Sequence, residues 1–178
     1  MRHLIGSSVV RGLVACFVSV VALNARADEQ TVINESLFSL SLPGKWRGSY
    51  DKQSDSWQYR SADGREAVTV GVLRRNAGSN PQAIKADFEI NLRARRESEV
   101  NLNGRKVRLT EPEVHQRGVA VLAHYSGVDA PNGRRTLTRV IVNEVVAGSF
   151  YYEGLDFSAT VFEARAKIVL AKIRLIDK

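Results

Sequence analysis

The stretch "SLFSLSLPGKWRGSY", Ser36–Tyr50, decides how the fold is read. In it Phe38, Leu40 and Leu42 alternate with serines, which is the period-two pattern of a strand with one buried face. A proline-glycine pair then ends the strand, because proline cannot donate to a sheet ladder and glycine permits a turn. The folded domain is therefore predicted to begin with a strand, and Trp46 follows directly after its end.

Downstream, a hairpin and a helix are predicted. The Asp63-Gly64 turn joins two alternating segments, Trp57–Ser61 and Ala67–Leu73, into the hairpin. Asn80-Pro81 begins the helix, which is expected to run to about Glu97, because asparagine caps a helix and proline fits its first turn. The buried stripe of this helix is expected at Ile84, Phe88 and Leu92.

The second half of the chain is predicted to form a run of strands and a closing helix. Turn dipeptides separate the strands, which indicates an antiparallel meander of Arg105–Glu113, Val119–Ser126, Arg135–Val146 and Ser149–Leu155. The closing helix begins near Asp156–Ser158. Its buried face is expected at Val161, Ala164, Ile168, Ala171 and Leu175, widened by Phe162, Val169 and Ile173.

This order of elements predicts an α+β fold in which a single antiparallel β-sheet is flanked by two main helices. One sheet covered in this way is the simplest arrangement that buries the apolar stripes of both helices. We place this single domain at residues 37–178, after a flexible leader at residues 28–36.

The first 27 residues have the layout of a cleaved secretory signal. Arg2 and Arg11 are followed by an uncharged apolar run, Leu13–Leu23, and Ala25 and Ala27 stand at the two positions that signal peptidase reads. The run is shorter than the roughly 20 apolar residues of a membrane-spanning helix. We therefore expect cleavage after Ala27 and a periplasmic or secreted bacterial protein with no stable membrane span.

Two alternatives to cleavage remain. The segment Leu13–Cys16 resembles a lipobox, so the chain is alternatively a lipoprotein anchored through Cys16, although most of the apolar run follows that cysteine. The other alternative is an uncleaved hydrophobic anchor. Cys16 is the only cysteine, so a cleaved chain has none. Thiol catalysis, cysteine-based zinc sites and iron–sulfur ligation are then excluded, and the core must hold the fold without disulfides.

The charge of the chain is only mildly basic once the leader is set aside. The whole sequence has 26 Lys and Arg against 19 Asp and Glu, a net charge of +7. Arg2, Arg11 and Arg26 lie in the signal, which leaves 23 basic against 19 acidic residues, or +4. Nucleic acid is an unlikely partner at this charge. A mild preference for acidic partners or for the anionic envelope surface is expected.

Residue patterns for catalysis or metal binding are weak. His115 is expected at a strand end and His124 on a strand, where it fits a hydrogen-bonded wall residue, and neither has a partner at metal-ligand spacing along the chain. Serine nucleophile elbows and glycine-rich phosphate loops are absent. Glu144, Glu153 and Asp156 fit strand and helix-cap positions. We expect no catalytic residue, no metal and no cofactor.

The stretches "SLSLPGKW", Ser39–Trp46, and "AKIVLAKIRL", Ala166–Leu175, resemble the PsbP-like family in their letters, and the order of elements resembles it over Leu37–Leu175. That family includes the PsbP subunit of photosystem II, a eukaryotic Ran-binding factor, bacterial DcrB-like envelope proteins, cargo chaperones of type VI secretion and some periplasmic immunity proteins. The resemblance implies a PsbP-like α/β/α sandwich that binds other proteins. It implies no catalytic residues, and the export signal favours the DcrB-like or immunity branch.

Aromatic and arginine side chains are the candidate partner-binding residues, because such residues are enriched where proteins bind each other. The candidates are Trp46, Arg47, Tyr59, Arg60, Arg74 and Arg75. The competing interpretation of Trp46 is structural: it closes the sheet against a helix. In that case replacing it by alanine lowers stability before it alters binding.

Together these patterns predict a small exported, non-enzymatic protein that binds a protein partner in the bacterial envelope, as a DcrB-like accessory factor. A periplasmic immunity protein that neutralises a type VI secretion toxin is one alternative. A ligand-carrying or hydrolytic protein with its site between sheet and helices is another.

Overall fold

The computed structural model describes residues 30–76, 80–101 and 106–176. The predicted signal with its cleavage residues Ala25 and Ala27, and the alternative lipid anchor at Cys16, lie outside these residues. Within the described ranges, no helix combines the length and the hydrophobicity needed to cross a membrane.

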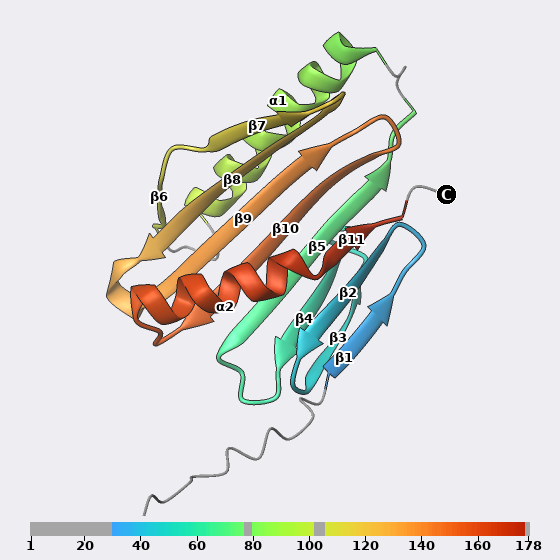
Figure 1. Ribbon diagram of the computed structural model, residues 1–178. Helices are drawn as coiled ribbons and strands as arrows, with labels where there is room; N and C mark the ends of the chain where they lie inside the picture. Colours follow the sequence, from blue (N-terminus) through green and yellow to red (C-terminus); the bar gives the residue numbers. More distant parts are fainter. Residues whose placement is uncertain (1–29, 77–79, 102–105, 177–178) are drawn as a thin grey trace, which may run out of the picture.

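Along the chain, five strands are followed by a helix, a second group of strands, a closing helix and a last short strand (Figure 1). The first half contains β1 (Gln30–Asn34), β2 (Phe38–Pro43), β3 (Trp46–Asp51), β4 (Ser56–Ser61), β5 (Glu66–Arg74) and α1 (Pro81–Val100). The second half contains β6 (Arg108–Leu109), β7 (Glu113–Arg117), β8 (Ala120–Asp129), a single 3-10 turn (Ala130–Asn132), β9 (Arg134–Val142), β10 (Val146–Leu155), α2 (Ala159–Ala171) and β11 (Ile173–Leu175).

The strands form two antiparallel sheets where the sequence predicted a single one. The large sheet has the order β3-β4-β5-β10-β9-β8-β6, with β7 also paired to β8, and the small sheet has the order β1-β2-β11. The break at Pro43 and Gly44 separates the sheets, because the chain leaves β2 through a residue with a φ of +87° before it enters β3. The α+β class and the two flanking helices are as predicted.

The helices lie on opposite faces of the large sheet (Figure 1). On one face α2 and the small sheet enclose the larger apolar cluster, which includes Leu40, Val70, Phe150 and Leu170. On the other face α1 encloses a smaller cluster that includes Phe88. The large sheet is therefore buried on both sides, although α1 packs mainly on β8, β9 and β10 and leaves β3–β5 without a helix on that face.

The opening stretch has the predicted structure. Phe38, Leu40 and Leu42 are buried in the larger cluster, while the serines between them are half-buried. Trp46 is only 7% exposed and belongs to the same cluster. Its indole Nε1 donates a hydrogen bond of 2.9 Å to the carbonyl of Pro43. The tryptophan therefore closes the end of the apolar core.

The predicted flexible leader at residues 28–36 is wrong in its larger part, because Gln30–Asn34 form β1 and pair with β2 along its length. Thr31 ties the two sheets together: its Oγ1 accepts a hydrogen bond from the backbone N–H of Trp46 and donates one to the carbonyl of Gly44. The strand was missed because it packs little apolar surface: Ile33 is half-buried and Val32 is exposed.

Two further expectations changed in the structure. The first helix extends to Val100 rather than Glu97, with Asn80 as its N-cap as predicted. Of the strand predicted at Arg105–Glu113, only Arg108–Leu109 forms a strand, β6, before Pro112, and a second strand, β7, begins at Glu113 and runs to Arg117. Both pair with β8, and Arg105 lies outside the described residues. Pro112 has no backbone N–H for the ladder, which explains the interruption.

The closing helix buries a different face from the one expected. It ends at Ala171, and its buried residues are Phe162, Ala166, Val169 and Leu170. Val161 and Ile168, expected on the buried face, are each 50% exposed. Both sets recur at helical spacing, so the pattern alone did not distinguish them. Leu175, expected on this helix, lies in β11.

Candidate functional site

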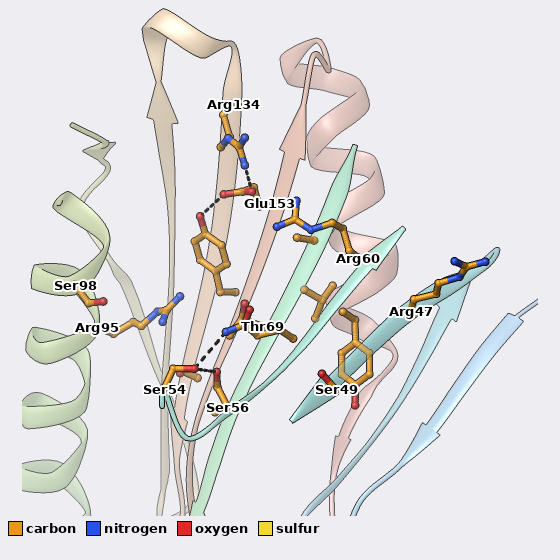
Figure 2. A pocket seen from close by; sticks show the side chains of 17 residues that line it. Arg47, Ser49, Ser54, Ser56, Arg60, Thr69, Arg95, Ser98, Arg134 and Glu153 are labelled. Atoms are coloured by element: carbon orange, nitrogen blue, oxygen red, sulfur yellow. Dashed lines mark hydrogen bonds and ion pairs between the residues drawn. The ribbon is translucent and has the colours of Figure 1, made fainter. Parts of the chain in front are cut away.

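A polar groove of about 950 Å³ lies on the α1 face of the large sheet, over the strands that α1 leaves uncovered. Side chains alternate between the two faces of a strand. The residues that come directly before and after the buried core residues on β3–β5 therefore point into this groove. Figure 2 shows it between α1 and the hairpin of β3 and β4. It is lined by Arg47, Ser49, Ser54, Ser56, Gln58, Tyr59, Arg60, Ala67, Val68, Thr69, Gly71, Arg95, Ser98, Arg134, Ser149, Tyr151 and Glu153.

Two arginines face each other across the outer hairpin of the groove. Arg47 on β3 and Arg60 on β4 are direct cross-strand partners, and both are exposed. Like charges in this position repel each other and destabilise the pair of strands. Neither arginine makes a hydrogen bond or an ion pair with another residue in the described part of the chain. The hairpin therefore carries an uncompensated double positive charge.

A third arginine enters the groove from α1 (Figure 2). Arg95 donates from Nε to the carboxylate of Glu99, at 2.8 Å, and its guanidinium lies 4.8 Å from the ring centre of Tyr151. Both contacts hold the side chain in one orientation, since a cation over an aromatic face is attracted to it. The planar guanidinium is left with its remaining N–H groups for a ligand.

The carboxylate that holds Arg95 is buried between helix and sheet. Glu99 is 1% exposed, and its Oε1 also accepts hydrogen bonds from the hydroxyls of Tyr125 and Thr138, at 2.9 and 2.8 Å. Burial, and next the negative charge of Glu99, raise the pKa of Tyr125, so its phenol stays protonated and donates. Because the hydroxyls come from β8 and β9, Glu99 fixes the end of α1 to the sheet.

The fourth arginine is neutralised within the groove wall. Arg134 forms an ion pair with Glu153, and the other oxygen of Glu153 accepts a hydrogen bond of 2.8 Å from the hydroxyl of Tyr151 (Figure 2). Burial is the main cause that raises the pKa of Tyr151, and Glu153 adds to it. Tyr151 thus joins Arg95 and Glu153. Arg95 is paired with Glu99, so the uncompensated positive charge of the groove belongs to Arg47 and Arg60.

Hydroxyl and amide groups line the opposite end of the groove. Ser54 and Ser56 share a hydrogen bond of 2.8 Å, and the side-chain amide of Gln58 donates to Ser54 and to Asp51. Of the residues that the structure describes, no histidine lines the groove. These serines therefore lack an imidazole base, and the groove is suited to hydrogen bonding with an anionic or amide-rich ligand.

The six predicted partner-binding residues divide into three groups. Arg47 and Arg60 lie together in the groove, and Arg74 is exposed at the end of β5, outside it. Trp46 and Tyr59 are core residues, although Tyr59 also contributes to the groove lining, and burial raises the pKa of Tyr59 to about 12.

Arg75 belongs to the interior rather than to a binding surface. Its side chain is 2% exposed, it forms an ion pair of 2.6 Å with Asp87 of α1, and it donates to the carbonyl of Asn143. The partners that bury its charge are distant in the sequence, so the Arg74-Arg75 pair gave no sign that only one of the two is exposed.

Sequence reasoning missed the part of the groove that comes from distant elements. Arg95 and Arg134 were not among the candidate partner-binding residues, yet both line the groove. The sequence feature that could have indicated the groove is the set of small polar residues that alternate with core residues on β3–β5. The end of α1 that faces them is placed by tertiary contacts, which no local pattern reports.

The histidine expectation also needs correction. His115 and His124 lie outside the groove, and cross-strand pairing brings them close to Glu113. The two histidines therefore have a possible metal-ligand partner in the fold, although the spacing along the chain did not indicate one.

No protein-family model and no curated protein sequence matches this chain. Solved structures match it in fold. The solution structure of cyanobacterial PsbP (CyanoP) from Synechocystis sp. PCC 6803 superposes with a TM-score of 0.61 at 11% identity, over 86% of this chain and 96% of that one. A crystal structure from Bacteroides thetaiotaomicron VPI-5482 has a TM-score of 0.52 at 12% identity, over 85% of this chain and 49% of the other.

A weaker match is the crystal structure of LpqN, involved in cell envelope biogenesis of Mycobacterium tuberculosis, with a TM-score of 0.45, 10% identity, and coverage of 83% and 90%. At these identities the likeness concerns the fold alone. The match to CyanoP spans nearly the whole of that protein. The chain therefore has the PsbP-like α+β fold.

Proposed function

We propose that this protein is a non-enzymatic binding protein of the bacterial envelope, and that it holds an acidic segment of a protein partner in the groove. The observation that carries the proposal is the facing pair Arg47 and Arg60, with Arg95 across the groove from it. A like-charge pair costs stability in the free protein, and an anionic partner removes that cost.

The lining of the groove favours a protein segment over a carried small molecule. Small-molecule pockets are mostly apolar with a few polar groups, whereas this groove is built largely from Arg, Ser, Thr and Gln side chains. Guanidinium groups bind carboxylates with two parallel hydrogen bonds, and the hydroxyls and amides match backbone groups. Binding is also favoured over hydrolysis, because hydrolysis needs a base beside the nucleophile.

The test uses a fluorescently labelled peptide rich in glutamate and the charge-reversal variant Arg47→Glu/Arg60→Glu. Peptide binding, followed by fluorescence anisotropy, should weaken at least about tenfold, since two charge-assisted contacts are lost. The matched control is Lys167→Glu/Arg174→Glu, which changes the net charge equally on exposed positions of α2 and β11, and it should bind as the parent does. Equal binding by both variants would contradict the proposal.

The same pair of variants identifies the partner. Pull-down from periplasmic extract should recover a protein with the parent and the control but not with the Arg47→Glu/Arg60→Glu variant. A toxin as the recovered partner decides for the immunity role, and a resident envelope protein decides for the DcrB-like accessory role. Contact with the anionic envelope surface is the competing use of this charge, so binding to phosphatidylglycerol vesicles in place of any protein would overturn the proposal.

A further inference from the structure

A second cluster of chemically active side chains lies at the other edge of the large sheet, on the face opposite the groove. Glu113 and His115 are two residues apart on β7, and His124 on β8 is the direct cross-strand partner of Glu113. Residues two apart on a strand and their cross-strand partner point to the same face. The three side chains therefore share one patch, which α2 does not cover.

The three groups already lie close to the spacing of metal ligands. Nε2 of His124 is 2.9 Å from a carboxylate oxygen of Glu113, and one ligand atom from each residue lies within 4.8 Å of the others. Two ligands of a tetrahedral zinc ion, each about 2.0–2.1 Å from it, are about 3.3 Å apart. The histidine and glutamate thus need to separate by only a few tenths of an ångström to admit an ion.

The third ligand has to turn. The rings of His115 and His124 are stacked, with centres 5.4 Å apart and an angle of 11° between their planes. Parallel rings cannot both direct a nitrogen lone pair at one ion, so the ring of His115 must rotate about its Cβ–Cγ bond. That torsion is soft, and the side chain is exposed, so the rotation meets little resistance.

Two arginines face the same patch and set a limit on affinity. Arg139 is the cross-strand partner of His124 on β9, and Arg117 lies on β7 beyond His115. Arg139 directs its guanidinium to the carbonyl of Leu170 on α2, at 3.1 Å. The charge of Glu113 offsets part of the repulsion of a cation, so we expect moderate rather than tight binding.

We propose that Glu113, His115 and His124 form a binding site for a divalent transition-metal ion of the zinc class. Imidazole nitrogen is a ligand for zinc, copper, nickel and cobalt, whereas magnesium and calcium prefer oxygen alone. Three protein ligands leave one position of a tetrahedral ion for water or for a side chain from a partner. The site is independent of the groove, since it shares no residue with it.

The experiment titrates the purified protein, with any affinity tag removed, with Zn²⁺ alone in a calorimeter. One ion should bind per chain with a dissociation constant below about 100 μM. The variants His124→Gln and Glu113→Gln should each weaken binding at least about tenfold. The control Glu111→Gln, an exposed carboxylate two residues from Glu113, should bind as the parent does.

Co²⁺ provides a second readout, because tetrahedral Co²⁺ with nitrogen ligands has strong visible absorption bands, whereas octahedral Co²⁺ held by water and a surface carboxylate has only weak ones. Thermal unfolding without metal shows that each variant is folded. Zn²⁺ should raise the midpoint of the parent and of the Glu111→Gln control by the same amount, and that of His124→Gln and Glu113→Gln by less. The proposal is overturned if Zn²⁺ does not bind, if His124→Gln binds as well as the parent, or if Mg²⁺ binds equally well. In that event the cluster is only a surface ion pair beside a stacked ring.

Discussion

At the scale of single residues, arginine has different roles in this protein according to what surrounds it. Arg75 is buried and paired with Asp87, so it contributes to the structure. Arg95 is held by Glu99 but keeps part of its guanidinium for the groove. Arg47 and Arg60 are exposed and face each other. Only the last two carry charge that the described residues do not neutralise, and these are the arginines we expect a partner to recognise.

Trp46 provides a test at this scale, because the sequence left it open between the core and a binding surface. Replacing Trp46 by alanine should lower the free energy of unfolding by about 3–5 kcal/mol, the usual cost of a large cavity in a core. Urea unfolding measures the loss. Binding of the glutamate-rich peptide should stay within about twofold of the parent, because the Trp46 side chain points away from the groove. A twofold change in affinity corresponds to about 0.4 kcal/mol, far less than the expected loss of stability. A stable variant that no longer binds would return Trp46 to the binding surface.

At the scale of elements, the position of α1 creates the groove. The helix is fixed to the sheet at both ends, by Asp87 paired with Arg75 near its start and by the buried Glu99 near its end. It therefore covers β8–β10 and forms a wall beside β3–β5. The shape of the groove is therefore set by the strands that α1 covers and leaves uncovered, and not by the conformation of a loop.

The first strand supplies a prediction at this scale. A chain that lacks residues 30–34 loses β1 and exposes the edge of β2, together with the Thr31 contacts that join the two sheets. We expect a lower midpoint of thermal unfolding and concentration-dependent association, since an uncovered apolar strand edge pairs with other chains. Light scattering and thermal unfolding of the two chains check this. An unchanged midpoint with no association would mean that β1 adds no stability.

At the scale of the whole molecule, the core is rich in buried tyrosines that bind carboxylates. Tyr152 donates to Glu66 at 2.5 Å, and Arg165 binds the same carboxylate from α2. Tyr125 and Tyr151 bind Glu99 and Glu153 on the opposite face. Each phenol donates to an acid, so each has to stay protonated for the fold to keep these contacts.

Stability should therefore fall in alkali. Burial raises the pKa of Tyr125, Tyr151 and Tyr152, and that of Tyr59 to about 12. Above pH 10, where a tyrosine in the unfolded chain loses its proton, the folded state binds more protons than the unfolded state. The free energy of unfolding then falls by up to about 1.4 kcal/mol per pH unit for each such tyrosine.

Urea unfolding between pH 9 and pH 11 measures this slope. The variant Tyr152→Phe should show a slope smaller by about one tyrosine, because it has one phenol fewer to titrate. A free energy of unfolding that does not change over this range would contradict the assigned role of the buried phenols.

The sequence by itself determined the local elements of this protein. Alternation in Phe38–Leu42, the Asp63-Gly64 turn and the Asn80 cap are signals between near neighbours, and the strand, the hairpin and the helix follow from them. The α+β class follows in turn, since amphipathic elements of these kinds bury their apolar faces by packing on one another.

Tertiary structure alone decided the division into two sheets, the face that α2 buries and the two candidate sites. Helix α2 has two faces with similar apolar spacing, and the shape of the sheet on which it packs determines which of them is buried. Residues 30–34 form a strand because β2 provides an edge with which they pair. Helix packing places Arg95 across the groove from Arg47 and Arg60, and strand register places His124 directly opposite Glu113. Charge and ligand geometry act through space. Arg47 and Arg60 were candidates from the sequence, but their place beside Arg95 and the grouping of Glu113, His115 and His124 became visible only in the folded chain.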